Sequence, residues 1–179
     1  MTGSIWQSER PKSYQPLAEL AGEARGLTRQ DFCRAHPTCS LIVGGDATAD
    51  SAAEEFVTGT TRIAVGLRLE VVLDHGAFIV PLAKRAETFP GIIWVGRDRP
   101  CDVWLPVPTI SKLHGQFTAA PGGEFDLSDL GSTNGTFVNG LKLEPKKNHR
   151  LMEGDLICFG HLNVRFHGPA GLWGLARSA

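Results

Sequence analysis

The sequence has no apolar run of the about 18–20 residues that a membrane span requires, so we expect no transmembrane helix. It also lacks a cationic amino terminus followed by an apolar run, which argues against a secretory signal and makes a cytoplasmic location the expectation. The formal net charge is only −1. This near balance gives no general reason to expect nucleic acid or an anionic membrane as a partner.

Known enzyme signatures are absent as well. The sequence contains no G-x-S-x-G elbow, no Walker A loop, no G-x-G-x-x-G and no H-E-x-x-H. A catalytic triad is defined by geometry, and spacing along the chain supports none here. We therefore expect a protein that is not an enzyme and that needs no cofactor.

The four cysteines are scattered and form no Cys-x-x-Cys pair. In CRAHPTC, Cys33, His36 and Cys39 are three residues apart, but a tetrahedral zinc site needs a fourth ligand and no second cluster supplies one. We expect reduced, partly buried thiols, a histidine at a helix end and no metal. A metal-dependent enzyme built on this segment is the remaining alternative, which metal analysis of the pure protein would detect.

The first 66 residues are expected to form an N-terminal helical extension and linker. Apolar residues recur at helical spacing within residues 13–26, and Gly26 can end that helix. Thr28 is placed as the N-cap of a second short helix that Pro37 closes. Residues 44–61 are small, acidic and polar, which is typical of a surface loop or linker.

After residue 66 the pattern becomes almost entirely strand-like. Short apolar or alternating segments are each bounded by Gly, Pro, Asn or Asp. They cover residues 67–73, 77–83, 92–96, 102–107, 114–120, 124–130, 136–139, 141–144, 154–160 and 162–167. Many short strands at such spacing predict a mainly β protein with a β-sandwich fold.

Polar side chains follow three of these predicted strands. Gly96-Arg97 follows the strand at 92–96, the sequence TISKLHG follows 102–107, and Ser-Thr-Asn-Gly at 132–135 follows 124–130. Counting strand directions places the three connections at the same end of the sandwich. Together they carry a guanidinium, an ammonium, two hydroxyls and a carboxamide. Such a set suits a dianionic cluster of oxygens better than acid–base chemistry.

The order of these motifs resembles that of a forkhead-associated (FHA) domain. Gly-Arg, Ser-x-x-His, Ser-Thr-Asn-Gly-Thr and Val-Asn-Gly occur in the family order, and GDLICFG closes the series. The resemblance covers residues 67–168 and leaves 1–66 and a tail at 169–179 unexplained. It implies a single eleven-stranded antiparallel β-sandwich whose loops bind phosphothreonine in partner proteins.

The resemblance also implies a role for each matching residue. Arg97 would hold two phosphate oxygens with its planar fork, and Lys112 would add a point charge. Ser111 and Thr133 would donate hydroxyl hydrogens to the phosphate, and Asn134 would bind the peptide backbone. The residues expected to support the loops are Gly96, His114, Gly135 and Asn139.

The preference for residues around the phosphothreonine is less defined. In the family, positions that match Thr109 and the turn at 159–163 often select the third residue after the phosphothreonine, so Thr109 and Leu162 are candidates. Lys146, Lys147 and Arg150 make the loop at 144–150 basic. Attraction of acidic partners and simple solvation of this loop both stay open.

The resemblance implies a phosphothreonine-dependent adaptor in Ser/Thr kinase signalling. Its partner would be a phosphothreonine-containing protein, either a kinase substrate or the kinase itself. The alternative is a scaffold that binds without phosphate through Trp94 and Trp104, which are expected to point outward opposite each other and to be covered by the N-terminal segment or a partner. Phosphorylation of Thr28 or Thr60 could also fill the pocket from within, although helix capping is the preferred role of Thr28.

Overall fold

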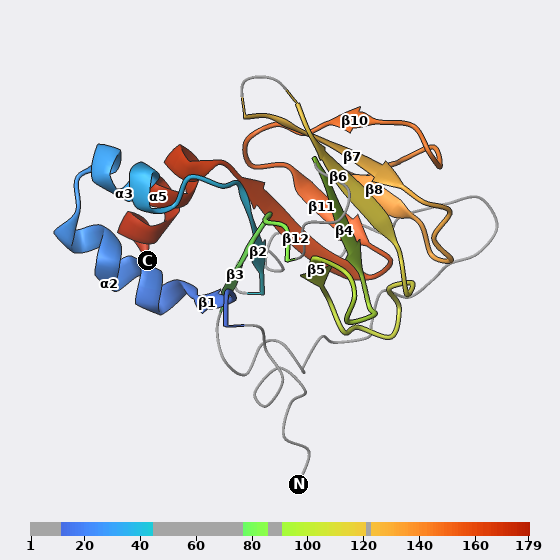
Figure 1. The fold of residues 1–179 in the computed structure, drawn as a ribbon, viewed down its shortest axis with the longest axis horizontal. Helices are drawn as coiled ribbons and strands as arrows, with labels where there is room; N and C mark the ends of the chain where they lie inside the picture. The colour runs from blue at the N-terminus through green and yellow to red at the C-terminus, as the bar shows by residue number, and fades with distance from the viewer. Residues whose placement is uncertain (1–11, 45–76, 86–90, 121–122) are drawn as a thin grey trace, which may run out of the picture.

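The computed structural model describes residues 12–44, 77–85, 91–120 and 123–179, which form a β-sandwich of two sheets with three helices at one side (Figure 1). The predicted mainly β sandwich is thereby confirmed. The predicted number of eleven strands stays a prediction, because several segments, including the strand expected at 67–73, lie outside the described residues. None of the described helices is long and apolar enough to cross a membrane.

The larger sheet has the strand order β1-β3-β2-β12-β11-β8-β9, and the smaller sheet has the order β10-β7-β6-β4-β5. The strands of the larger sheet are β1 (Gln15–Pro16), β2 (Ser40–Val43), β3 (Phe78–Pro81), β8 (Thr136–Val138), β9 (Leu141–Lys142), β11 (Leu156–Phe159) and β12 (Leu162–His167). Those of the smaller sheet are β4 (Ile92–Gly96), β5 (Val103–Trp104), β6 (Gly115–Ala119), β7 (Phe125–Asp129) and β10 (His149–Arg150). Among the described strands, only β5 pairs in parallel, with β4.

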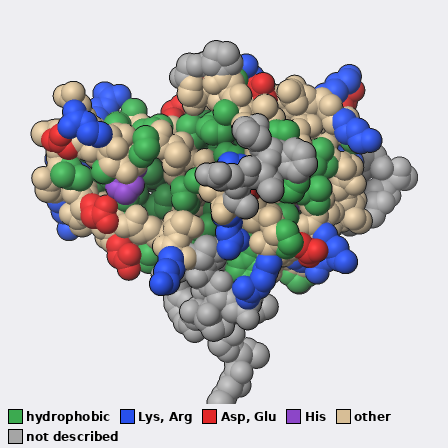
Figure 2. Space-filling model, viewed as in Figure 1, with side chains coloured by type: hydrophobic (Ala, Val, Ile, Leu, Met, Phe, Trp, Pro, Cys, Tyr) green, Lys and Arg blue, Asp and Glu red, His purple; other side chains and the backbone are tan. Residues whose placement is uncertain are grey.

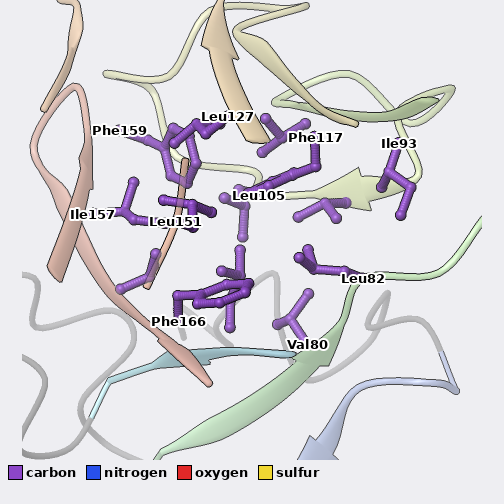
Figure 3. Close-up of a cluster of buried hydrophobic side chains, with 14 of the residues drawn as sticks. Val80, Leu82, Ile93, Leu105, Phe117, Leu127, Leu151, Ile157, Phe159 and Phe166 are labelled. Carbon is purple, nitrogen blue, oxygen red and sulfur yellow. The ribbon is translucent and has the colours of Figure 1, made fainter. Parts of the chain in front are cut away.

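The main core lies between the two sheets (Figure 3). Side chains alternate between the faces of each strand, so Leu162, Val164 and Phe166 of β12 point inward while the residues between them are half-buried. Phe117 and Leu127 enter from the smaller sheet and are completely buried. This core holds the strand ends that carry the polar loops.

A second core joins the larger sheet to the helices α2 (Leu17–Gly26), α3 (Arg29–Ala35) and α5 (Pro169–Ser178). Ile42 of β2 packs in this cluster with Phe32 and Leu172, whereas Leu41 and Val43 face the main core. Because both faces of β2 are covered, all four of its residues are buried, and the three that follow Ser40 are apolar without alternation. The boundary predicted at residue 66 placed residues 40–43 in the extension, whereas β2 belongs to the larger sheet.

The two ends of the chain take part in this packing. Helix α5 forms within residues 169–179, which were expected to be a tail, and it lies beside α2 and α3 (Figure 1). Pro169 begins the helix, and Glu153 accepts a hydrogen bond of 2.8 Å from the backbone N–H of Gly168. The strands β1 and β2 both precede residue 66 and yet belong to the larger sheet. Chain from before the expected FHA segment thus adds two strands to the larger sheet, and chain from after it adds a helix to the second core.

Thr28 is the N-cap of α3, as predicted. Its hydroxyl oxygen accepts a hydrogen bond of 3.2 Å from the backbone N–H of Asp31 and donates one of 2.7 Å to the Asp31 carboxylate. Thr60, the other candidate for phosphorylation, lies outside the described residues.

The expected outward-facing tryptophan pair is wrong. The parallel register sets Trp104 opposite Gly96, not opposite Trp94, and Trp104 is only 5% exposed. Trp94 is half-buried, with the Lys84 ammonium 5.4 Å from the centre of its ring. An open tryptophan face for phosphate-independent binding is thus absent from the described part of the molecule.

Candidate functional site

The loops after β4, β5 and β7 meet at one end of the sandwich, at the lower right in Figure 1. This happens because β5 runs parallel to β4, and because β6 is antiparallel to both β4 and β7. Figure 2 shows several Lys and Arg side chains along the lower edge of the same face. In the described part of the structure the three loops thus lie together, as the sequence predicted.

Arg97 is held by two hydrogen bonds to the loop at 110–111, one from its backbone and one from its side chain. Its N–H donates to the Ser111 carbonyl at 2.9 Å, and its Nε donates to the Ile110 carbonyl at 3.1 Å. The side chain is exposed, and its two terminal amino groups have no partner among the described residues. The guanidinium is therefore oriented by the loop while two sets of donors face solvent.

Ser111 and Thr133 connect two of the loops. The Ser111 hydroxyl oxygen accepts from the Thr133 backbone N–H at 3.0 Å, and the two hydroxyl oxygens lie 3.4 Å apart. The neighbouring Lys112 is exposed, and its ammonium forms no ion pair within the described ranges. The hydroxyls and the two cationic residues thus belong to one connected set of loops.

Asn134 is held from one side only. Its Nδ2 donates to the Thr109 carbonyl at 2.7 Å, and its exposed side chain keeps its oxygen and a second hydrogen available. Gly160 permits this approach, because its φ is +64° and a Cβ there would lie 2.4 Å from the same carbonyl oxygen. The carboxamide of Asn134 can therefore bond to the backbone of a second peptide chain.

The two residues expected to select peptide sequence are less accessible. Leu162 is 1% exposed and belongs to the main core, so the structure contradicts its expected contact with a peptide. The Thr109 hydroxyl is buried without a hydrogen-bond partner, so it also points away from solvent. Both were placed by resemblance alone, and alternation along β12 turns Leu162 inward.

His114 supports the loops from behind. It is fully buried, its Nδ1 accepts from the Ser111 backbone N–H at 3.1 Å, and its Nε2 lies 3.2 Å from the Gly135 carbonyl oxygen. Because Nδ1 accepts, the ring hydrogen of the neutral form is on Nε2 and donates to Gly135. Burial lowers the pKa of His114, and the nearby charge of Asp129, which would raise it, only partly offsets this effect. A histidine used in this way cannot take a proton from the Ser111 hydroxyl.

Sequence analysis missed Asp129, which organises the loop at 131–135. Its Oδ1 accepts from the backbone N–H groups of Gly131 and Ser132 at 2.8 and 2.9 Å, and its Oδ2 accepts both the Ser132 and Thr136 hydroxyls at 2.6 Å. Burial alone would raise the pKa of Asp129, but these hydrogen bonds lower it overall. The signal in the sequence was an aspartate followed two and three residues later by Gly and Ser, which is typical of an Asx turn.

Lys142 was missed as well. Its Cε would lie 2.9 Å from a Cβ built on Gly135, so the lysine stem crosses the glycine directly beside Asn134. The φ of +82° at Gly135 is a backbone conformation that other residues rarely adopt, so it favours glycine there. Gly96 is required for another reason, since a Cβ there would lie 2.2 Å from the Lys112 carbonyl oxygen.

Other expected residues lie further from the loops. Asn139 bonds to Asp155 and Leu156 at the far end of β8, so it supports a turn opposite the site. Within the basic loop, Lys146 donates its backbone N–H to the Asp129 carbonyl at 2.7 Å, which places this loop beside the site. Lys147 is paired with Glu144, and Arg150 is paired with Asp126 and Glu124.

The described residues contain no group of three or more His, Cys, Asp and Glu side chains that could hold a metal ion. In the CRAHPTC segment, His36 follows α3 as its C-cap and bonds to Glu23 at 3.2 Å. Cys39 is buried, and Cys33 is half-buried. The histidine is thus at a helix end, where the sequence placed it.

The buried histidine predicts a pH dependence of stability. Because the pKa of His114 is lower in the folded protein than in the unfolded chain, the unfolded chain binds more protons below about pH 6.5. We expect the free energy of unfolding to fall as the pH is lowered from 7 through this range. Denaturant titrations at pH 7.5, 6.5 and 5.5 would measure this free energy. We expect it to change less with pH in the His114→Gln variant than in the wild type. If the free energy of unfolding changed equally with pH in both proteins, this role of His114 would be contradicted.

Comparison with known proteins agrees with the geometry. The family model for the FHA domain matches residues 93–160. The oxoglutarate dehydrogenase inhibitor of Corynebacterium efficiens is 40% identical over 76 residues, which are 42% of this chain and 51% of the relative. The glycogen accumulation regulator GarA of Mycolicibacterium smegmatis is 38% identical over 71 residues, 40% of this chain and 42% of the relative. The chain spans about half or less of the length of these relatives.

A longer match comes from an uncharacterized protein of Mycobacterium bovis, which is 31% identical over 152 residues, 85% of this chain and 83% of the relative. Among solved structures, the MEK1 FHA domain in complex with a HOP1 phosphothreonine peptide is 28% identical and covers 50% of this chain and 87% of that one, with a TM-score of 0.42. The family match falls on the loops described above, and the chain belongs to the forkhead-associated domain family.

Proposed function

We propose that this protein binds phosphothreonine in a partner protein through Arg97, Ser111, Lys112, Thr133 and Asn134. The observation that carries the proposal is the exposed guanidinium of Arg97, which is fixed through its Nε and leaves both terminal amino groups free. A planar fork in this state matches two oxygens of a phosphate group. The hydroxyls of Ser111 and Thr133 add further donors beside it.

The charge balance of the site favours a phosphate over a carboxylate. A phosphothreonine carries about −1.5 to −2 charges and three strong acceptor oxygens. The loops offer the cations Arg97 and Lys112 beside the two hydroxyls, and Lys142 extends the positive charge past Gly135. Asp129, which holds the loop at 131–135, is buried, and its carboxylate accepts four hydrogen bonds. A dianion would therefore meet donors and no exposed carboxylate from that residue.

A binding role fits these groups better than a catalytic one. His114 is buried, and both its ring nitrogens are engaged with backbone groups. Ser111 therefore lacks the adjacent base that would activate a nucleophile. We propose an adaptor that is not an enzyme and that holds a phosphorylated partner without changing it.

The relatives support a place in kinase signalling. A regulator and an inhibitor are among them, and so is the serine/threonine-protein kinase RAD53 of Saccharomyces cerevisiae, which is 33% identical over 90 residues. The proposed partner is a protein that carries phosphothreonine, either a kinase substrate or a kinase itself. Threonine kinases are the enzymes that would create the ligand.

Binding to a degenerate phosphothreonine peptide library tests this function. We expect retention of the phosphothreonine library and much weaker retention of matched phosphoserine and unphosphorylated libraries. The enriched peptides would also report whether Lys142 and Lys146 select acidic neighbours. Equal retention of the phosphorylated and unphosphorylated libraries would overturn the proposal.

A further inference from the structure

Tyr14 closes one side of the sandwich between the edges of the two sheets. It directly precedes β1, the edge strand of the larger sheet, whereas β5 is the edge strand of the smaller sheet. The tyrosine is only 2% exposed and belongs to the main core. A residue from the N-terminal extension thus links the edge strand of the larger sheet to that of the smaller sheet.

The Tyr14 hydroxyl bonds both backbone groups of Trp104 in β5. Its oxygen accepts from the Trp104 N–H at 2.7 Å, and its hydrogen is donated to the Trp104 carbonyl at 3.1 Å. The hydroxyl therefore makes the hydrogen bonds that a neighbouring strand would otherwise make to the edge strand β5. Burial raises the pKa of Tyr14 to about 12, so the donor hydrogen is present at neutral pH.

Trp104 in turn holds the backbone of Arg97. Its indole Nε1 donates to the Arg97 carbonyl at 2.9 Å, and Leu105 donates its N–H to the Gly96 carbonyl, also at 2.9 Å. Two more bonds to the loop at 110–111 fix the amide and the Nε of Arg97. The indole is the contact that ties the arginine to β5, and β5 is the strand that Tyr14 completes.

We propose that Tyr14 and Trp104 are positioning residues for phosphate binding, so that the N-terminal extension sets the orientation of Arg97. This inference rests on the proposed function. Tyr14 lies well outside the matched span of residues 93–160. The binding module of this protein therefore begins before the family segment. Its affinity for the phosphopeptide depends on whether residues 12–16 are packed against β5.

Tyr14→Phe and Trp104→Phe in the full chain test the proposal. Tyr14→Phe keeps the ring and removes the hydroxyl, whereas Trp104→Phe keeps an aromatic residue and removes the indole donor. We expect each to weaken binding of a phosphothreonine peptide by about fivefold or more, the amount that one lost hydrogen bond represents. Ile42→Val is the control, since it loosens the helix-facing core and leaves the Tyr14 contacts unchanged.

A double-mutant cycle separates positioning from loss of stability. In an Arg97→Lys background, which has no fork to orient, Tyr14→Phe should change affinity by less than about twofold. A merely structural effect would lower affinity equally in both backgrounds and would overturn the inference. So would wild-type affinity in both phenylalanine variants. If the wild-type protein itself bound no phosphopeptide, the proposed function would fail first, and the two failures are thus distinguishable.

Discussion

Arg97→Ala is expected to weaken binding of a phosphothreonine peptide by about 2–5 kcal/mol, because a largely desolvated phosphate loses its main counter-charge. The terminal amino groups of Arg97 have no partner among the described residues, so the planar guanidinium is available as a bidentate donor at the three loops. Isothermal titration calorimetry with one phosphopeptide and both proteins would measure the difference. The exposed position of the side chain implies little loss of fold stability, which thermal unfolding would verify.

Arg97→Lys is the matched control for charge. It keeps the positive charge and gives up the planar fork, so we expect affinity between those of the wild type and the alanine variant. An affinity equal to the wild type in the alanine variant would show that the phosphate binds elsewhere. Equal affinities of the lysine variant and the wild type would show that charge alone accounts for binding.

Asp129→Ala is expected to have the largest effect on stability. The substitution leaves two backbone N–H groups and two hydroxyls without their acceptor next to the buried ring of His114. Since each unsatisfied buried donor costs about 1–3 kcal/mol, we expect a loss of about 3 kcal/mol or more in the free energy of unfolding. Denaturant titration monitored by tryptophan fluorescence would measure it.

Asp126→Ala provides a control from the same strand. Asp126 lies three residues earlier in β7, and its carboxylate pairs with Arg150 at the surface. Surface ion pairs contribute about 0–1 kcal/mol, so this variant should stay close to the wild type. A loss of stability from Asp126→Ala as large as that from Asp129→Ala would contradict the organising role of Asp129.

Much of the sandwich was predictable because its strands face the core on one side only. Alternation and turn residues marked β4, β6, β7 and β12 at nearly their observed bounds. The same reasoning failed for β2, where helices cover the second face, and for Trp104, where the parallel pairing with β4 changes which residues are opposite. The local sequence pattern predicts neither the helices that cover β2 nor the parallel pairing of β5, because both depend on the tertiary structure.

The candidate site was predictable in its exposed residues and not in its support. Arg97, Thr133 and Asn134 stand in motifs whose order the family fixes, so the sequence led to them directly. Asp129 escaped because one aspartate before a turn is common, and Tyr14 escaped because 90 positions separate it from Trp104. Leu162 was misjudged, since a motif position does not tell which way the side chain points.

The packing of α5 against α2 and α3 has a consequence for how this chain folds. These helices come from opposite ends of the sequence, so their contacts are among the most non-local in the molecule. Closing a loop of nearly the whole chain costs entropy before the packing returns any energy. During synthesis the first helices leave the ribosome long before their partner exists. We therefore expect the contacts of α5 with α2 and α3 to form late in folding, only after residues 169–178 have been synthesised.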